Sequence, residues 1–336
     1  MTSEAPLLKV RGLTKHFIVR GGLLSREVGR VRAVDGLDIE VSSGRTLGLV
    51  GESGCGKSTA GRLILRLIEP DAGEVQFEGR NLQANSAAEM RRLRRNMQFV
   101  FQDPFASLNP RMTVGEIIEE SLIVHGIGTR EERRDRIATT LRSVGLRPEM
   151  MDRYPHEFSG GQRQRIGIAR ALVLEPKLII ADEPLSALDV SVQASVMNLM
   201  QDIQDRFGIA FILIAHDLAA VEHLSDDVAV MYLGRVVEIA SAEAIYSEPK
   251  HPYTRILLAS VPSLDPRAPR NWSRIEGEIP SPMRPPSGCP FHTRCPSRMD
   301  VCSQKKPALQ TLPDGARVAC HLYGETDIEA ACELQH

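Results

Sequence analysis

Nine consecutive residues, 51–59, have the composition of a phosphate-binding loop. They match the pattern G-x-x-x-x-G-K-[ST], in which backbone N–H groups wrap the α- and β-phosphates of a nucleotide. Glycines let the chain turn tightly and approach an anion, the lysine reaches the β- and γ-phosphates, and the next hydroxyl is offered to Mg²⁺. The predicted nucleotide-binding residues are Gly51, Glu52, Ser53, Gly54, Cys55, Gly56, Lys57, Ser58 and Thr59, with Ser58 also a Mg²⁺ ligand.

The segments around this loop have the periodicity that such a site needs. Residues 45–50 form an apolar run that predicts a buried strand entering the loop. Residues 59–68 predict a helix leaving it, with the positive end of the helix dipole facing the phosphates.

Hydrolysis of a nucleotide needs groups besides the loop, and three other predicted strands end in suitable side chains. An apolar run at 177–184 ends in Asp182, placed to hold Mg²⁺, and Glu183, which can act as general base for the attacking water. Gln102 ends the predicted strand 97–102 and His216 follows the predicted strand 210–215, and both could converge on the γ-phosphate. The alternative for Gln102 and His216 is a capping or surface polar residue.

The rest of the chain suggests two parts. Strand patterns at 7–13, 16–19 and 37–41 precede the loop, and residues 103–175 form a helical insertion in an otherwise α/β chain. A helix of roughly 18 residues is expected from Val190. Prolines crowd the chain after about Lys250, so regular helix is not expected there. We therefore predict an ATPase domain at 1–250 and a C-terminal extension at 251–336.

Composition indicates an ordinary globular protein. The 336 residues are 42% hydrophobic and 25% charged, and a net charge of −2 gives no bias toward nucleic acid. No apolar run reaches the roughly 18 residues needed to span a bilayer, and the first residues do not resemble a secretory signal. We expect a cytosolic protein whose membrane role, if any, comes through a partner.

A second anion-binding sequence decides between nucleotide-binding families. Residues 158–162 are Phe-Ser-Gly-Gly-Gln at a predicted helix start, which is a second anion-binding sequence. Because the chain already has a loop for its own nucleotide, we expect this sequence to cap the γ-phosphate of a nucleotide held by another subunit. Together with the loop at 51–59, Gln102, the strand ending at Glu183, the loop at 186–189 and His216, this chain resembles the ATP-binding cassette (ABC) family over about residues 7–240.

The resemblance implies an α/β P-loop ATPase core with an N-terminal antiparallel β subdomain and a helical subdomain. ATP and Mg²⁺ would be sandwiched between two such domains, with Glu183, His216 and Gln102 at the catalytic centre and Ser58, Gln102 and Asp182 around Mg²⁺. Phe17 would stack on adenine, although a core strand phenylalanine is the alternative. The residues acting across the dimer would be Ser159, Gly160, Gly161, Gln162 and Asp189.

A finer resemblance, to the ATPase subunits of oligopeptide and dipeptide importers, lies at 251–254, 100–104, 107–110 and 32–36. The last of these is similar to the F-type subunit. The resemblance implies a second ABC ATPase in a heterodimer, two permease subunits, an extracytoplasmic substrate-binding protein, no nucleic acid, and a position on the cytoplasmic face of the inner or plasma membrane. The helical insertion would dock a permease. Nickel importers share this subunit type, and a soluble ABC ATPase acting on ribosomes or DNA is a further alternative.

Four cysteines near the C-terminus form the remaining candidate site. Cys289, Cys295, Cys302 and Cys320 are spaced C-x5-C-x6-C-x17-C, without the close pairs of structural zinc sites. Wider spacing with proline after two of them fits a [4Fe–4S] cluster better, and members of the importer group are known to carry one. Zinc and reduced structural thiols are the alternatives.

Overall fold

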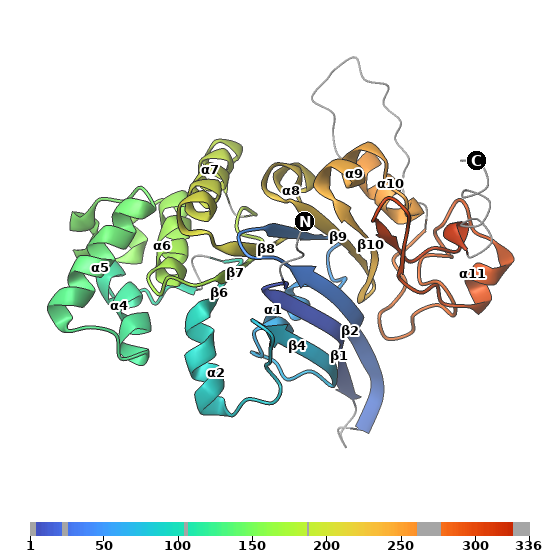
Figure 1. Ribbon diagram of the computed structural model, residues 1–336, viewed down its shortest axis with the longest axis horizontal. Helices are drawn as coiled ribbons and strands as arrows, with labels where there is room; N and C mark the ends of the chain where they lie inside the picture. The colour runs from blue at the N-terminus through green and yellow to red at the C-terminus, as the bar shows by residue number, and fades with distance from the viewer. Residues whose placement is uncertain (1–4, 22–25, 104–106, 187, 261–276, 325–336) are drawn as a thin grey trace, which may run out of the picture.

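Two β-sheets form the body of the molecule, and a group of helices extends from the β6 edge of the larger one (Figure 1). The computed structural model describes residues 5–21, 26–103, 107–186, 188–260 and 277–324. The α/β class predicted from the sequence is confirmed.

The larger sheet carries the edge at which the chemistry was predicted. Its strand order is β11-β12-β10-β9-β3-β8-β7-β6, parallel from β9 to β6 and antiparallel beyond β9. β3, β7 and β8 are buried along their whole length, as their apolar runs require. The bounds are β3 Thr46–Val50, β6 Met97–Val100, β7 Leu178–Asp182, β8 Ala210–Ala215, β9 Asp227–Tyr232, β10 Arg235–Ser241, β11 Gln310–Thr311 and β12 Arg317–Val318.

The smaller sheet is antiparallel, with the order β2-β1-β4-β5, and confirms the N-terminal β subdomain. The two strands expected at 7–13 and 16–19 are one strand, β1, because irregularities between Val10 and Thr14 let pairing continue. A second hydrophobic cluster packs under this sheet against the first helix, α1. The bounds are β1 Leu8–Gly21, β2 Arg26–Val41, β4 Ala72–Phe77 and β5 Arg80–Asn81.

The helices of the insertion begin where capping residues stand in the sequence. α4 (Val114–Val124), α5 (Arg130–Ser143) and α6 (Gly160–Leu172) each start with a capping box, in which a Ser or Thr side chain and a Glu or Gln three residues later bond each other's backbone N–H. α7 (Val190–Phe207) has the 18 residues expected of it and ends at Gly208, a left-handed residue.

The remaining helices are short. None of the helices within the described ranges is long and apolar enough to cross a membrane. Their bounds are α1 Lys57–Ile64, α2 Ala87–Leu93, α8 Leu218–Leu224, α9 Ala242–Ser247, α10 Pro252–Ala259 and α11 Asp300–Gln304, with 3₁₀ turns at Arg94–Asn96, Pro148–Asp152, Pro155–Glu157 and His321–Tyr323.

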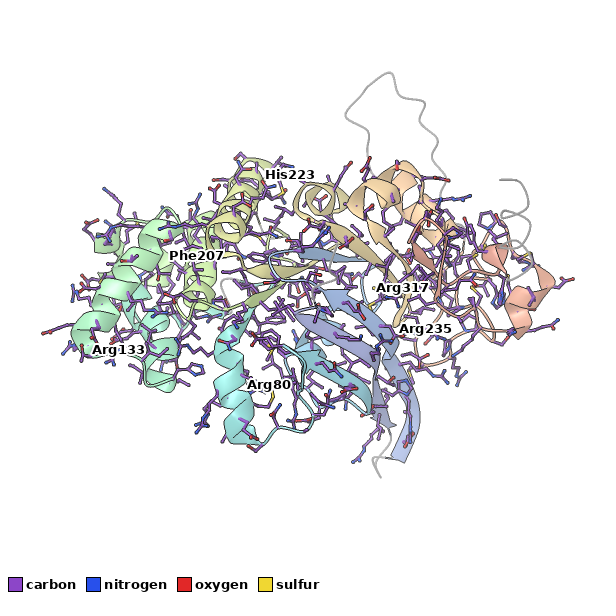
Figure 2. All side chains as sticks on the ribbon, viewed as in Figure 1. Arg80, Arg133, Phe207, His223, Arg235 and Arg317 are labelled. Atoms are coloured by element: carbon purple, nitrogen blue, oxygen red, sulfur yellow. The ribbon has the colours of Figure 1, made fainter. Side chains whose placement is uncertain are left out.

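The C-terminal extension contains helix, contrary to the sequence expectation. α10 begins at Pro252, and proline is tolerated at a first helical position because no N–H is needed there. The extension also continues the larger sheet, since β12 pairs with β10 at Glu238 and Val318. Figure 2 shows Arg317 of β12 close to Arg235 of β10, and Arg133 at the helical end of the molecule. The domain boundary near residue 250 stays a prediction.

Candidate active site

The loop at 51–59 has the conformation that its glycines predict. It leaves buried β3 and enters α1, and Gly51 and Gly56 have φ angles of 152° and 108°. A Cβ on Gly51 would lie 2.1 Å from the Met231 carbonyl oxygen, and one on Gly56 would lie 1.9 Å from that of Ala33. Glycine is therefore required at both positions by the neighbouring backbone as well as by φ.

Lys57 places a buried positive charge at this loop. Its side chain is 5% exposed, and Nζ donates hydrogen bonds to the carbonyl oxygens of Gly51 at 2.7 Å and Glu52 at 3.1 Å. No carboxylate in the described part of the chain forms an ion pair with it. A buried ammonium bonded only to neutral groups is suited to a phosphate, so the loop fits a nucleotide.

Asp182 and Ser58 lie side by side at the end of β7 and the start of α1. The Ser58 hydroxyl donates to Asp182 Oδ1 at 2.8 Å, and Asp182 is 1% exposed. Burial raises the pKa of the Asp182 carboxyl, with the Ser58 hydrogen bond acting in the opposite direction. A carboxylate and a hydroxyl next to a phosphate loop form a donor set that fits Mg²⁺.

Glu183 is brought together with the two other predicted strand-end residues. Gln102 Nε2 donates to Glu183 Oε2 at 2.6 Å, and His216 Nδ1 lies 3.5 Å from the same oxygen. Glu183 has a φ of 47°, in the left-handed region, and its N–H donates to the carbonyl of Ile214 on β8, so the backbone turns directly after Asp182. The catalytic roles of Gln102 and His216 stay predictions.

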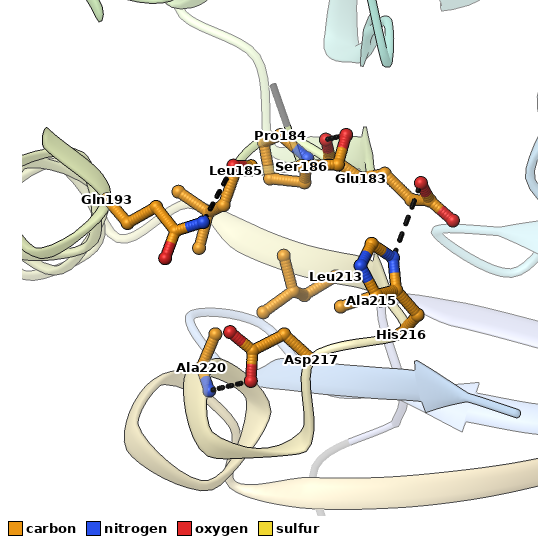
Figure 3. Close-up of a pocket in the computed structure, with 10 residues that line it drawn as sticks. All are labelled: Glu183, Pro184, Leu185, Ser186, Gln193, Leu213, Ala215, His216, Asp217 and Ala220. Atoms are coloured by element: carbon orange, nitrogen blue, oxygen red, sulfur yellow. Dashed lines mark hydrogen bonds and ion pairs between the residues drawn. The ribbon is translucent and has the colours of Figure 1, made fainter. Parts of the chain in front are cut away.

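A pocket of about 60 Å³ opens beside Glu183 and His216. Figure 3 shows the two side chains facing each other across its rim, with Asp217 and Ala220 from the start of α8 on the far wall. Ser186 and Gln193 complete the polar lining. This volume holds a few water molecules next to the carboxylate, as hydrolysis requires.

The second glycine-rich sequence belongs to a different part of the molecule. Ser159 is the N-cap of α6, and its backbone and side chain exchange hydrogen bonds with Gln162. Gly161 is packed so closely that a Cβ would lie 2.3 Å from Val192 of α7, and Gly160 faces Leu188. Asp189 caps α7 through the Val192 N–H. All of these contacts are local to α6 and α7, so no described hydrogen bond links this group to the 51–59 loop.

Phe17 lies on β1 and is 38% exposed, with the Lys15 ammonium 5.7 Å from the ring centre. An exposed ring can stack on a ligand, whereas a core phenylalanine is buried. Stacking on adenine stays a prediction.

The four C-terminal cysteines gather in the extension as free thiols. Burial raises the pKa of Cys320 to about 11, and the charges of Cys289, Cys295 and Cys302 add to this rise. Within the residues that the structure describes, no three or more His, Cys, Asp or Glu side chains are arranged to hold a metal ion. The geometry therefore does not support the predicted [4Fe–4S] cluster.

Two site neighbours were not expected from the sequence. Tyr253 and Arg294 of the extension both contact Glu52 in the loop. They are 201 and 242 residues away from it along the chain, and no local pattern signals such a contact.

Comparison with known proteins agrees with this geometry. Residues 34–186 match the ABC transporter family and residues 237–302 match the oligopeptide/dipeptide transporter C-terminal region. A Brucella ovis protein named for peptide import and ATP binding is 54% identical over 95% of this chain and 98% of its own. The chain belongs to the ABC transporter ATP-binding subunits.

Further comparisons extend over the same core. The oligopeptide transport ATP-binding protein AppF of Bacillus subtilis is 50% identical to this ABC subunit over 96% of the chain and 98% of its own length. A dimeric ATP-binding cassette solved in a post-hydrolysis state with ADP and Pi matches with a TM-score of 0.62 and 28% identity, over 70% of this chain and 98% of that one. The ABC subunit is thus an ATPase that uses Mg²⁺ and ATP.

Proposed function

We propose that the chain is the ATP-hydrolysing subunit that drives import of di- and oligopeptides through a membrane permease complex. One observation carries the ATPase assignment: the side chains of Gln102 and His216 both approach Oε2 of Glu183 at the edge of the larger sheet. The peptide cargo is supported by the extension, which matches the oligopeptide/dipeptide transporter C-terminal region, and by the names of the relatives.

The residues have distinct roles in this proposal. The N–H groups of residues 51–59 and the Lys57 ammonium bind the phosphates of ATP. Ser58, Asp182 and Gln102 would hold Mg²⁺, which when bound would offset the charge of the β- and γ-phosphates.

Glu183 accepts the proton of the attacking water at Oε2. Its neighbours orient that carboxylate: Gln102 donates a hydrogen bond to it, and His216, which follows the neighbouring parallel strand β8, lies 3.5 Å from it. Water oxygen attacks γ-phosphorus and the β–γ bridging oxygen leaves with ADP, so the carboxylate gains the proton that the water loses.

A second subunit completes the site. The N–H groups of Ser159 and Gln162 are used within their own capping box, so in this proposal the N–H groups of Gly160 and Gly161, in the first turn of α6, bind a nucleotide held elsewhere. We assign Ser159, Gly160, Gly161, Gln162 and Asp189 to the ATP bound by a partner ATPase, in a heterodimer of the F-type subunit with a related chain.

The helical insertion contacts the permease in this scheme. Gln102 follows β6, at the hinge where the insertion begins. In this scheme, binding of the γ-phosphate at Gln102 and the contact between the insertion and the permease switch together between two states. The complex includes two permease subunits and an extracytoplasmic binding protein, and the chain lies on the cytoplasmic face of the membrane.

A [4Fe–4S] cluster at Cys289, Cys295, Cys302 and Cys320 remains a proposal from sequence alone. Iron and sulfide analysis of anaerobically purified protein tests it, with a brown absorbance expected. A colourless, iron-free and folded protein would rule out the cluster and leave zinc or reduced thiols, which a zinc assay of the same sample separates.

Co-purification tests the assembly. The full chain, captured from bacterial membranes in detergent, should bring two permease subunits and a related ATPase in stoichiometric amounts. Recovery of ribosomes or DNA instead would overturn the transport assignment in favour of a soluble ABC ATPase.

A further inference from the structure

Glu52, the second residue of the phosphate-binding loop, is held by the C-terminal extension at two points. Its backbone N–H donates to the Tyr253 hydroxyl at 3.0 Å. Its carboxylate accepts two hydrogen bonds from Arg294, from Nη1 at 2.8 Å and from Nη2 at 3.0 Å. This is a bidentate guanidinium–carboxylate pair, the geometry in which such pairs are strongest and most directional.

The residues that hold Glu52 are buried and contact one another. The Arg294 side chain is 4% exposed, and Nη1 also donates to the Tyr232 hydroxyl at 3.2 Å. Tyr232, Tyr253 and Phe291 form a cluster of rings whose centres lie 4.7 to 5.3 Å apart. The Arg294 N–H donates to the Phe291 carbonyl, which ties the arginine to these rings.

Glu52 in turn positions the lysine that binds phosphate. The Glu52 carbonyl accepts a hydrogen bond from Lys57 Nζ at 3.1 Å. A displacement of residue 52 therefore moves one of the acceptors that hold the Lys57 ammonium in place. The loop binds an anion, and an unpaired carboxylate within it would repel phosphate in a low-dielectric site. Arg294 compensates that charge.

We infer that Tyr253 and Arg294 are positioning residues for ATP, through which the C-terminal extension sets the affinity of the phosphate-binding loop. Neither residue touches the reacting atoms in this account. The inference rests on the proposed ATP site at residues 51–59 and gives the extension a direct function in it.

Equilibrium binding of a fluorescent ATP analogue with Mg²⁺ to the full chain tests the inference. Tyr253→Phe removes one hydroxyl without changing the ring cluster and should raise the dissociation constant about three- to tenfold. Arg294→Met should raise the dissociation constant about ten- to hundredfold, because the loop loses the two hydrogen bonds from Arg294 and the Glu52 carboxylate is left unpaired. Arg294→Lys keeps the positive charge but cannot donate two parallel hydrogen bonds, so its dissociation constant should lie between those of Arg294→Met and the wild type.

Matched controls separate this effect from general damage to the extension. Tyr323→Phe removes a hydroxyl that donates to the Lys250 carbonyl at 3.0 Å, and Arg298→Met removes an exposed arginine four residues beyond Arg294. Both controls should bind the analogue as the wild type does. In the assembled transporter, Tyr253→Phe should raise the KM for ATP and leave kcat within about twofold, since binding and not the chemical step is changed.

The outcomes are distinguishable. A wild-type chain that binds no nucleotide would refute the proposed ATP site itself. Folded Tyr253→Phe and Arg294→Met variants with wild-type affinity, or controls that lose affinity equally, would refute the positioning role while leaving the ATP site intact.

Discussion

Replacement of Glu183 by glutamine removes the proposed base and little else. The side chain is isosteric, and its amide oxygen can still accept the hydrogen bond that Gln102 donates at 2.6 Å. Exchange of a charged acceptor for a neutral one costs about 1 kcal/mol of stability at most. General base catalysis contributes about 10²- to 10⁴-fold, so the activation free energy should rise by about 3–5 kcal/mol.

Phosphate release by the assembled transporter measures this loss directly. With the isolated ATPase subunits, ATP binding should be unchanged. Because the bound nucleotide is not hydrolysed, a closed dimer should accumulate with ATP and Mg²⁺ and appear on size-exclusion chromatography. Gln193→Ala, at the opposite wall of the pocket from Glu183, serves as a control for disturbance of the pocket. Turnover of Glu183→Gln close to that of the wild type would show that another group takes the proton of the water.

Three further outcomes follow from the structure. Gly56→Ala should abolish binding of the ATP analogue to a folded chain, because its Cβ would lie 1.9 Å from the Ala33 carbonyl oxygen. Asp182→Asn should weaken Mg²⁺-dependent nucleotide binding about ten- to hundredfold, measured by a Mg²⁺ titration at fixed nucleotide. Burial lowers the pKa of His251 to about 3 from 6.5, so below pH 6.5 the unfolded chain binds a proton that the folded chain does not. The free energy of unfolding should then fall by about 1.4 kcal/mol per pH unit toward pH 3, and His251→Asn, which keeps the helix cap, should remove that slope in urea unfolding; an unchanged slope would assign it to other groups.

Much of the site was predictable because its parts are local or follow from parallel-sheet geometry. Residues 51–59 carry their conformation in three glycines, and the capping residues of α4, α5 and α6 fix where those helices begin. Gln102, Glu183 and His216 follow strands whose carboxyl ends share one edge, so their meeting could be expected without knowing a distance.

Other features depend on contacts that no sequence pattern reveals. The pairing of Glu52 with Arg294 joins residues 242 positions apart, and only the packing of the extension against the loop brings them together. α10 was missed because a count of prolines does not distinguish a first helical position, where Pro252 lies, from an interior one. The cysteine spacing suggested a cluster, but spacing alone does not determine where the side chains point.

Uptake into proteoliposomes tests the central claim most directly. The reconstituted complex, with its binding protein outside the vesicle and ATP inside on the side of this chain, should accumulate a labelled oligopeptide while releasing phosphate, and Glu183→Gln in this chain should stop both. Phosphate release that drives accumulation of Ni²⁺ but not of any peptide, or peptide uptake unaffected by Glu183→Gln, would contradict the account.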